Sequence, residues 1–400
     1  MNRKKVIAWI LYDFADTPVA ALYLTFFWPL YIKEHLGGNE LQIGLAMGLS
    51  LLAIAVSVPF IGALSDAWGR RMPILLVATL LTAITVAITG FAGLFAALIL
   101  GFLTRYLLSV DTDIYDAKLV DLVPQKRIGF VSGLGVGVGY LGTIAALVLA
   151  YPILNALGSE NLGAVRAMFW EGAAFLLIFS LPLFLLVKDP AAVSRTLMPV
   201  GKIFRKAFAE LKDTVLRMRD FGALPRFLLA SFVYNDAVNT TLLFLVLFSR
   251  QVIGVSIEQF LLAFGIMAAG AALGAFVFGF LSDRLGPKRG LSIALIGWIG
   301  VVGYLLFSPT FTALIIAGTI GGAMLGGIWT MNRHMITRIA PRKKIAEIFG
   351  IEGCTERLSG VIGPIAFGAI VVSFGYTPAL ILILFLLVLG FFLLQLVPRS

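Results

Sequence analysis

Charged residues are scarce in this chain of 400 residues. They make up only 13% of the sequence, whereas 60% of the residues are hydrophobic and the mean hydropathy is +1.00. A soluble globular domain carries about 25% charged residues. The shortage of charge therefore excludes a soluble domain and predicts a polytopic membrane protein.

Cysteine and the motifs of enzyme chemistry are equally scarce. The single cysteine, Cys354, cannot form an internal disulfide and is interpreted as a small packing residue. The sequence contains no Walker A pattern, no H-E-x-x-H and no nucleophile elbow. GVGYLG at 137–142 matches a dinucleotide pattern but follows no strand, so it predicts close helix packing instead. We expect neither an enzyme nor an ATP-driven pump, and no metal or organic cofactor.

Long apolar runs are abundant, and their lengths suit membrane helices rather than the strands of a barrel. The expected spans are 6–32, 41–64, 73–90, 92–116, 129–153, 165–187, 224–249, 257–281, 291–308, 311–336, 346–372 and 377–397. The predicted fold class is therefore an all-α membrane protein with twelve transmembrane helices. Residues 188–222 interrupt this series with a basic amphipathic segment, which we expect to lie on or near the membrane.

Positive charge lies almost entirely on one side of the predicted spans. Of the 31 lysines and arginines, 25 fall in loops or at span ends on the side of the two termini, 3 in loops or at span ends on the other side, and 3 deeper inside spans. The positive-inside rule then predicts that both termini of a multi-pass cell-membrane protein are cytoplasmic. This charge faces anionic lipid, so we expect membrane lipid as a partner and no nucleic acid.

Two polar motifs occur twice at nearly the same offset. GALSDAWGRR (62–71) and GFLSDRLGPKR (279–289) have their aspartates 217 residues apart, and YDFADT and YNDAVNT are offset by 222. This repetition predicts two six-helix halves, 1–187 and 223–400, joined by a linker at 188–222. Transporters built from such a duplication carry their site between the halves. Residues 396–400 resemble part of a protease-cleavage tag and are set aside.

The loop pattern G-x-x-x-D-(R)-x-G-x-(K/R)-(R/K) after spans two and eight resembles the signature loop of the major facilitator superfamily. WILYDFADT (9–17), YDAKLVDLVPQKRIGFVSGLGVGVGYLG (115–142) and FVYNDAVNT (232–240) are similar to the UMF1 group, which includes Atg22-like vacuolar amino-acid effluxers. The resemblance implies the fold of this superfamily and export of amino acids or similarly small polar metabolites. It also implies that Asp66 braces span eleven in the outward-open state.

Carboxylates inside apolar spans are costly, so those present are candidate functional groups. Asp13 and Asp16 are three residues apart and share one helical face, and Arg105 lies on one stripe of span four with Asp113. The acids would bind a coupling proton, a cation or an ammonium group, and Arg105 would bind a carboxylate or neutralise an acid. A permanent ion pair between these groups is the alternative. The predicted substrate- and proton-binding residues are Tyr12, Asp13, Asp16, Thr17, Arg105, Asp113, Tyr234, Asn235, Asp236, Asn239, Glu352 and Glu356.

Charged groups near the basic ends of the spans are predicted to form gates. The predicted gating residues are Asp66, Arg70, Arg71, Asp116, Asp283, Arg284, Arg289, Asn332 and Arg333. Residues near the span ends are left out of the count of intramembrane charges. The eight acids counted are Asp13, Asp16, Asp111, Asp113, Asp116, Asp236, Glu352 and Glu356, and the three bases are Arg105, Arg333 and Arg357. This surplus favours proton coupling or a substrate that carries positive charge.

The sequence thus predicts a monomeric secondary transporter that moves a small polar or zwitterionic solute by alternating access, as proton-coupled export. Sodium is the other coupling ion that such acids suit. A sodium- or proton-coupled symporter of sugars or other polar solutes is the alternative within transport. A non-transporting membrane sensor on the same fold is the alternative from another class.

Overall fold

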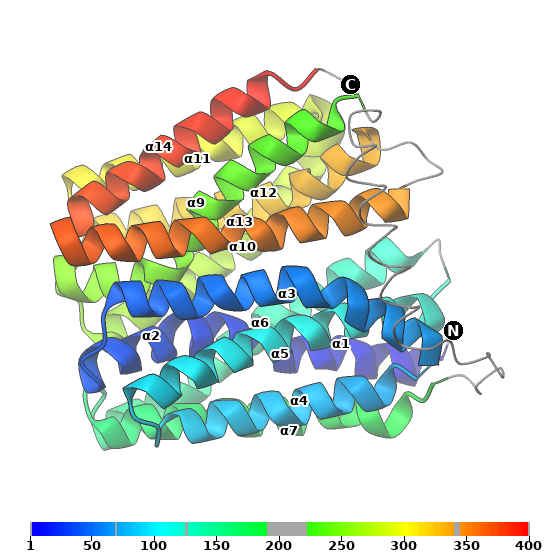
Figure 1. The fold of residues 1–400 in the computed structure, drawn as a ribbon, viewed down its shortest axis with the longest axis horizontal. Helices are drawn as coiled ribbons and strands as arrows, with labels where there is room; N and C mark the ends of the chain where they lie inside the picture. Colours follow the sequence, from blue (N-terminus) through cyan, green and yellow to red (C-terminus); the bar gives the residue numbers. More distant parts are fainter. Residues whose placement is uncertain (1, 69, 125–126, 190–221, 340–344, 399–400) are drawn as a thin grey trace. The chain divides into compact units, whose positions relative to one another are not determined.

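The computed structural model describes residues 2–68, 70–124, 127–189, 222–339 and 345–398 (Figure 1). Most of the predicted amphipathic linker at 188–222 lies outside these residues. Within them, twelve helices are long and apolar enough to cross a membrane, which confirms the predicted fold class. The elements, with η marking π-helices, are α1 (Arg3–Pro18), η1 (Val19–Phe27), α2 (Trp28–Leu30), η2 (Tyr31–His35), α3 (Glu40–Trp68), α4 (Met72–Thr89), α5 (Leu94–Leu122), α6 (Ile128–Leu157), α7 (Leu162–Leu186), α9 (Leu224–Phe248), η5 (Ser249–Ile253), α10 (Ile257–Leu285), α11 (Pro287–Phe307), α12 (Phe311–Ile339), α13 (Ile345–Phe374) and α14 (Tyr376–Gln395).

Several helices continue past the ends predicted for the apolar spans. α5 runs to Leu122, so Asp116 lies almost two turns inside the helix rather than at its end. α3 and α10 likewise extend through Asp66 and Asp283. Polar residues with good helix propensity continue a helix after the apolar run has stopped. Hydropathy therefore predicts where a helix lies in the membrane better than where it ends.

The chain divides into two compact units. Unit 1 comprises Met1–Gly37 and Leu49–Asp213, and unit 2 comprises Gly38–Gly48 and Thr214–Ser400. Compared with the predicted halves, the first turns of α3 group with unit 2. In that unit the Tyr376 hydroxyl donates to Glu40 Oε1 at 2.9 Å, and a side chain at Gly44 would collide with the Pro364 carbonyl. The α3 helix therefore contributes to both units.

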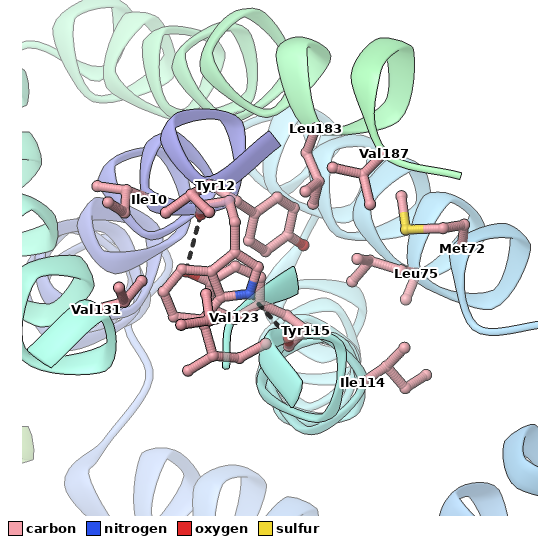
Figure 2. Packing of buried hydrophobic residues seen from close by; sticks show 14 of the residues in the cluster. Ile10, Tyr12, Met72, Leu75, Ile114, Tyr115, Val123, Val131, Leu183 and Val187 are labelled. Atoms are coloured by element: carbon pink, nitrogen blue, oxygen red, sulfur yellow. Dashed lines mark hydrogen bonds between the residues drawn. The ribbon is translucent and has the colours of Figure 1, made fainter. Parts of the chain in front are cut away.

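Buried aromatic rings join α1 to α5 in the core of unit 1 (Figure 2). Trp9 Nε1 donates to the Tyr115 carbonyl at 3.0 Å, and the Tyr115 hydroxyl donates to the Trp9 carbonyl at 2.9 Å. The two rings stack with centroids 4.4 Å apart, and Tyr12 stacks on Tyr115 at 4.8 Å. These contacts hold the α1 segment that carries Asp13 at a set height against α5.

Glycines on one face of α6 let this helix approach α1 closely. Gly135, Gly139 and Gly142 lie against Asp13, Thr17 and the Phe14 carbonyl, respectively. Pro18 has no amide hydrogen, so the Phe14 carbonyl has no donor four residues later in its own helix. The chain continues beyond Pro18 as the π-helix η1. The glycine run at 133–142 therefore serves helix packing, as its composition predicted.

The Gly142→Ala variant is expected to lower stability by about 1–3 kcal/mol, because a new Cβ would overlap the Phe14 carbonyl. The matched control is Gly137→Ala, since no atom lies within 4 Å of a Cβ at that position. Thermal unfolding of the purified protein in detergent compares the two. Equal unfolding temperatures would contradict the assigned α1–α6 packing.

Glycines also allow close helix packing in unit 2, between α10 and α12. Gly322 and Gly326 of α12 lie against the backbone of Met267 and Ala271, and Gly274 of α10 lies against Ala323. Small residues at such spacing allow membrane helices to pack backbone to backbone.

The C-terminal segment is bound to the start of α11. Lys288 donates to the carbonyls of Gln395 and Val397 at 2.9 and 2.5 Å. The segment that was set aside as tag-like thus includes a residue that is buried and bonded in the fold.

Candidate functional site

Acids of α1 and α5 meet around Asp16 in unit 1. This half-buried carboxyl group interacts electrostatically with Asp13, Asp116 and Arg105, and the Thr112 side chain lies beside it. The structure therefore brings together residues that the sequence placed on separate helices. Three carboxyl groups and one guanidinium group make this cluster strongly acidic.

Asp13 and Thr17 lie where α1 meets α6. Asp13 Oδ2 is close to the α-carbon of Gly135, and Thr17 Oγ1 is close to that of Gly139. Asp13 also interacts with Tyr115. Asp13 is half-buried. A larger residue at Gly135 would therefore displace Asp13, and one at Gly139 would displace Thr17.

The α5 helix separates its charged residues onto two faces. Thr104, Leu108, Asp111, Tyr115 and Lys118 are buried. Half-buried or exposed positions follow a second face, which includes Arg105, Ser109, Thr112, Asp113 and Asp116. Asp111 was not predicted as a site residue, because its side chain does not fall on the Arg105 stripe. Asp111 precedes Tyr115 by four residues, and this spacing could have placed Asp111 on the same face of α5 as that aromatic ring.

An ion-pair network around the buried Lys118 lies at the basic end of unit 1. Lys118 Nζ lies 2.9 Å from Asp189 Oδ1 and 3.1 Å from Asp121 Oδ2. The Asp189 carboxylate also accepts from the Met72 amide, at 3.2 and 3.0 Å, and so caps α4. Sequence reasoning missed Asp121 and Asp189, because both flank an apolar span rather than interrupt it.

The predicted gating residues of unit 1 are distributed around this network. Arg71 donates to the Ala117 carbonyl at 3.1 Å and lies 3.7 Å from Asp121 Oδ2. Arg70 is exposed, as is Asp116. The Asp66 side chain lies outside the described residues. Arg71 thus ties the loop after α3 to α5.

Unit 2 has its own polar cluster on α9, α12 and α13. The Tyr234 hydroxyl donates to Asn332 Oδ1 at 2.6 Å, and both residues are buried. Glu352 interacts with Glu356, Arg333 and Arg357, and both glutamates act on Tyr234. Asn332 was predicted at a gate. In the structure it lies inside unit 2, as the partner of Tyr234.

The remaining predicted residues of unit 2 take different positions. Asp236 is buried and its Oδ1 accepts from the Gly363 amide at 2.9 Å. Asn235 is buried and Asn239 is half-buried. Of the predicted gating residues, Arg289 is exposed and Arg284 stacks over Phe280 at 4.7 Å, whereas the Asp283 side chain is not described. Asp236 thus joins α9 to α13.

Metal ligation finds no support in the part of the chain that the structure describes. No group of three or more His, Cys, Asp and Glu residues there is arranged to hold a metal ion. The two clusters instead offer hydroxyl, amide, carboxyl and guanidinium groups. Such groups bind protons, ammonium groups and carboxylates.

A family model described as "Vacuole effluxer Atg22 like" matches residues 121–400. The chain belongs to this family. Among curated relatives, the uncharacterized MFS-type transporter YxiO of Bacillus subtilis is 23% identical over 99% of this chain and 95% of its own. The multidrug resistance protein MdtG of Salmonella choleraesuis is 27% identical over 88% of this chain and 84% of its own.

Solved structures share the fold. A bacterial homolog of the human lysosomal transporter Spinster matches with a TM-score of 0.74 and 17% identity, over 98% of this chain and 95% of that one. The D323A mutant of the nucleoside transporter NupG matches with a TM-score of 0.76 and 16% identity, over 99% and 100%. This Atg22-like protein is therefore a multi-pass secondary transporter of the major facilitator superfamily and not an enzyme.

The match to the Atg22-like model begins at residue 121, after most of α5. Asp13, Asp16 and Arg105 precede that residue, so their grouping rests on the structure alone. The polar cluster of unit 2 lies entirely within the matched residues.

Proposed function

We propose that this Atg22-like protein exports a small polar or zwitterionic solute, such as an amino acid, by alternating access coupled to proton movement. The observation that carries the proposal is the cluster around Asp16, where three carboxyl groups meet one guanidinium group. The cluster contains three acidic groups and one basic group. It therefore favours binding of a proton or of a positively charged group.

A zwitterion suits the mixed charge of these groups. Arg105 supplies a planar donor set for a carboxylate, and the surrounding aspartates supply acceptors for an ammonium group. In unit 2, Asn235 and the pair formed by Tyr234 and Asn332 supply neutral polar groups.

Export is favoured by the names of similar proteins. The matched family is described as an effluxer, and relatives at 25–27% identity are named multidrug resistance proteins or efflux pumps. The excess of basic residues beside the termini supports cytoplasmic termini. A solute leaving the cell would then enter from the basic side.

Transport by the purified protein in proteoliposomes tests the proposal. Internal pH is followed by fluorescence under an imposed pH gradient while pools of amino acids, sugars, nucleosides and inorganic cations are added in turn. Proton flux that depends on the amino-acid pool is the expected result. Tracer exchange of one solute without proton movement would contradict proton coupling, and binding without flux would indicate a sensor.

Export of organic cations is the second candidate. It is favoured by the surplus of carboxyl groups around Asp16 and by the relatives named multidrug resistance proteins. A lipophilic cationic dye added to the same proteoliposomes distinguishes the two. Dye-driven proton flux that amino acids do not elicit would support the second candidate over the first. Sodium-dependent sugar uptake would support the symporter alternative.

A further inference from the structure

Asp111 is the most completely enclosed acid among the described residues of unit 1. Asp111 is 0% exposed, and neither carboxyl oxygen has a hydrogen bond of good geometry in the described structure, although the Tyr12 hydroxyl and the Thr112 amide and hydroxyl lie within reach. Tyr12 and Thr112 lie close to it. However, the Tyr12 hydroxyl pairs with that of Thr79 at 2.7 Å, and Thr112 donates to the Leu108 carbonyl at 2.7 Å. A neutral carboxyl group is tolerated in such surroundings at a far lower cost than a carboxylate.

Arg105 does not neutralise Asp111. The two residues are six positions apart on α5, so their side chains point about 120° apart around the helix. Arg105 lies on the accessible face with Asp116, whereas Asp111 lies on the buried face with Tyr115. Asp111 therefore lies on a different face of α5 from Arg105, although Asp16 of α1 still interacts with it.

Few titratable groups face Asp111 from the neighbouring helices. Tyr12 and Asp16 of α1 act on it, and α4 (Met72–Thr89) contains no titratable side chain. α6 carries only Tyr140 and Tyr151, and α7 carries only Arg166 and Glu171. Arg166 donates to the Gly90 carbonyl at 2.8 Å, and Glu171 accepts from Tyr23. No cation among the described residues forms an ion pair with Asp111.

A line of buried hydroxyl groups runs along the contact between α4 and α5. This threonine seam consists of Thr79, Thr82, Thr85, Thr89 and Thr104, all buried. The Thr104 and Thr85 hydroxyls are 2.9 Å apart, and Thr82 Oγ1 has no partner in the described structure. Hydroxyl groups both donate and accept, so such a line can support proton transfer together with water. It leads from the Tyr12–Thr79 pair to the end of α4 at Thr89, away from the basic end of unit 1.

We propose that Asp111 binds the coupling proton inside unit 1 and that the threonine seam is its access path. The carboxyl group takes a proton from water reached along the seam. It returns that proton to water after unit 1 changes conformation, and no other bond forms or breaks. This inference rests on the proposed proton-coupled transport. It adds a proton site on the buried face of α5, next to the solute-binding acid Asp16.

Infrared spectroscopy of the purified protein tests the proton site without any solute. The carbonyl stretch of protonated carboxyl groups is measured in the unmodified protein and in Asp111→Asn, in normal and heavy water. Loss of part of this band in the variant is the expected result. An unchanged band would mean that Asp111 carries no proton, and would overturn the proposal even if transport is confirmed.

Proteoliposomes test whether the site is used in transport, with a labelled amino-acid pool as the probe. Asp111→Asn is expected to keep gradient-independent exchange of the label and to lose label-driven proton flux. Retained proton flux would overturn the proposal. If the unmodified protein exchanges no label, the proposed substrate class fails, and the infrared result still decides whether Asp111 holds a proton.

Two further variants distinguish a role of the threonine seam in proton access from a general effect of removing a buried hydroxyl group. Thr82→Val is expected to slow label-driven proton flux more than label exchange. The matched control is Thr143→Val on α6, which removes an equally buried hydroxyl outside the seam and is expected to leave the ratio of the two rates unchanged. Equal effects of Thr82→Val and Thr143→Val on this ratio would contradict the proposed path.

A second variant tests the proton site if Asp111→Asn does not fold. Asp111→Glu is expected to keep proton flux and to shift the infrared carboxyl band, and an unshifted band would overturn the proposal.

Discussion

The Arg105→Ala variant is expected to unfold at a markedly lower temperature than the unmodified protein. Arg105 attracts the Asp16 carboxylate electrostatically, whereas Asp13 and Asp116 repel it. Removing Arg105 takes away a cation that lowers the cost of a negative charge on Asp16. Breaking a fully buried ion pair costs about 3–5 kcal/mol, and we expect about 2–3 kcal/mol here because Arg105 is half-buried. Thermal unfolding followed by tryptophan fluorescence measures the change.

A double variant separates charge compensation from simple loss of packing. Adding Asp16→Asn to Arg105→Ala removes part of the unbalanced charge, so the double variant is expected to recover part of the lost stability. Arg3→Ala is the matched control, because Arg3 is exposed at the start of α1. A double variant that is no more stable than Arg105→Ala alone would show that the side chain acts through packing.

The Asp13→Asn variant is expected to abolish coupled transport while the protein remains folded. Asp13 is half-buried between α1 and α6 and interacts with Tyr115 and Asp16. Asparagine keeps the shape of the side chain but cannot exchange a proton or carry charge. With a gradient of about one pH unit, one coupled proton supplies about 1.4 kcal/mol, or about tenfold accumulation of solute. The variant is expected to lose this accumulation.

Uptake of labelled amino acids into proteoliposomes with and without the gradient measures the effect. Glu160→Gln is the control, since Glu160 is exposed in the loop between α6 and α7. The infrared carboxyl band assigned to Asp111 is expected to persist in Asp13→Asn, which separates the two acids. Accumulation at the unmodified level in Asp13→Asn would contradict the role proposed for this residue.

The acids of α1 were visible in the sequence because they interrupt an otherwise apolar run. The grouping of Asp13 and Asp16 follows from helical periodicity, and the glycine run of α6 indicated close packing before any contact was known. By contrast, Asp111 looked like one of three aspartates in SVDTDIYDAK. Periodicity assigned it to another face of α5 but did not reveal that this face is sealed by α1 and α4.

The network of Lys118, Asp121 and Asp189 illustrates a second limit. These residues lie at the polar ends of helices, where charge is common and carries little information. Only the structure places Asp189 against Lys118, 71 positions earlier, and against the α4 amide. Likewise, Asn332 has the sequence context of a gate, and its bond to Tyr234 assigns it to the interior of unit 2.

The sequence by itself determined the membrane class, the twelve spans, the internal repetition and the family resemblance, because these depend on composition and local periodicity. It also identified the costly acids of α1, since a carboxylate in an apolar run is recognisable without a partner. The tertiary structure alone decided which charges meet and which are enclosed. Arg105 lies near Asp16, Lys118 pairs with Asp189, and Asp111 is fully buried with no cation paired to it among the residues that the structure describes. The physical reason is that the energy of a charge in a membrane protein depends on the groups that surround it, and these come from distant parts of the chain.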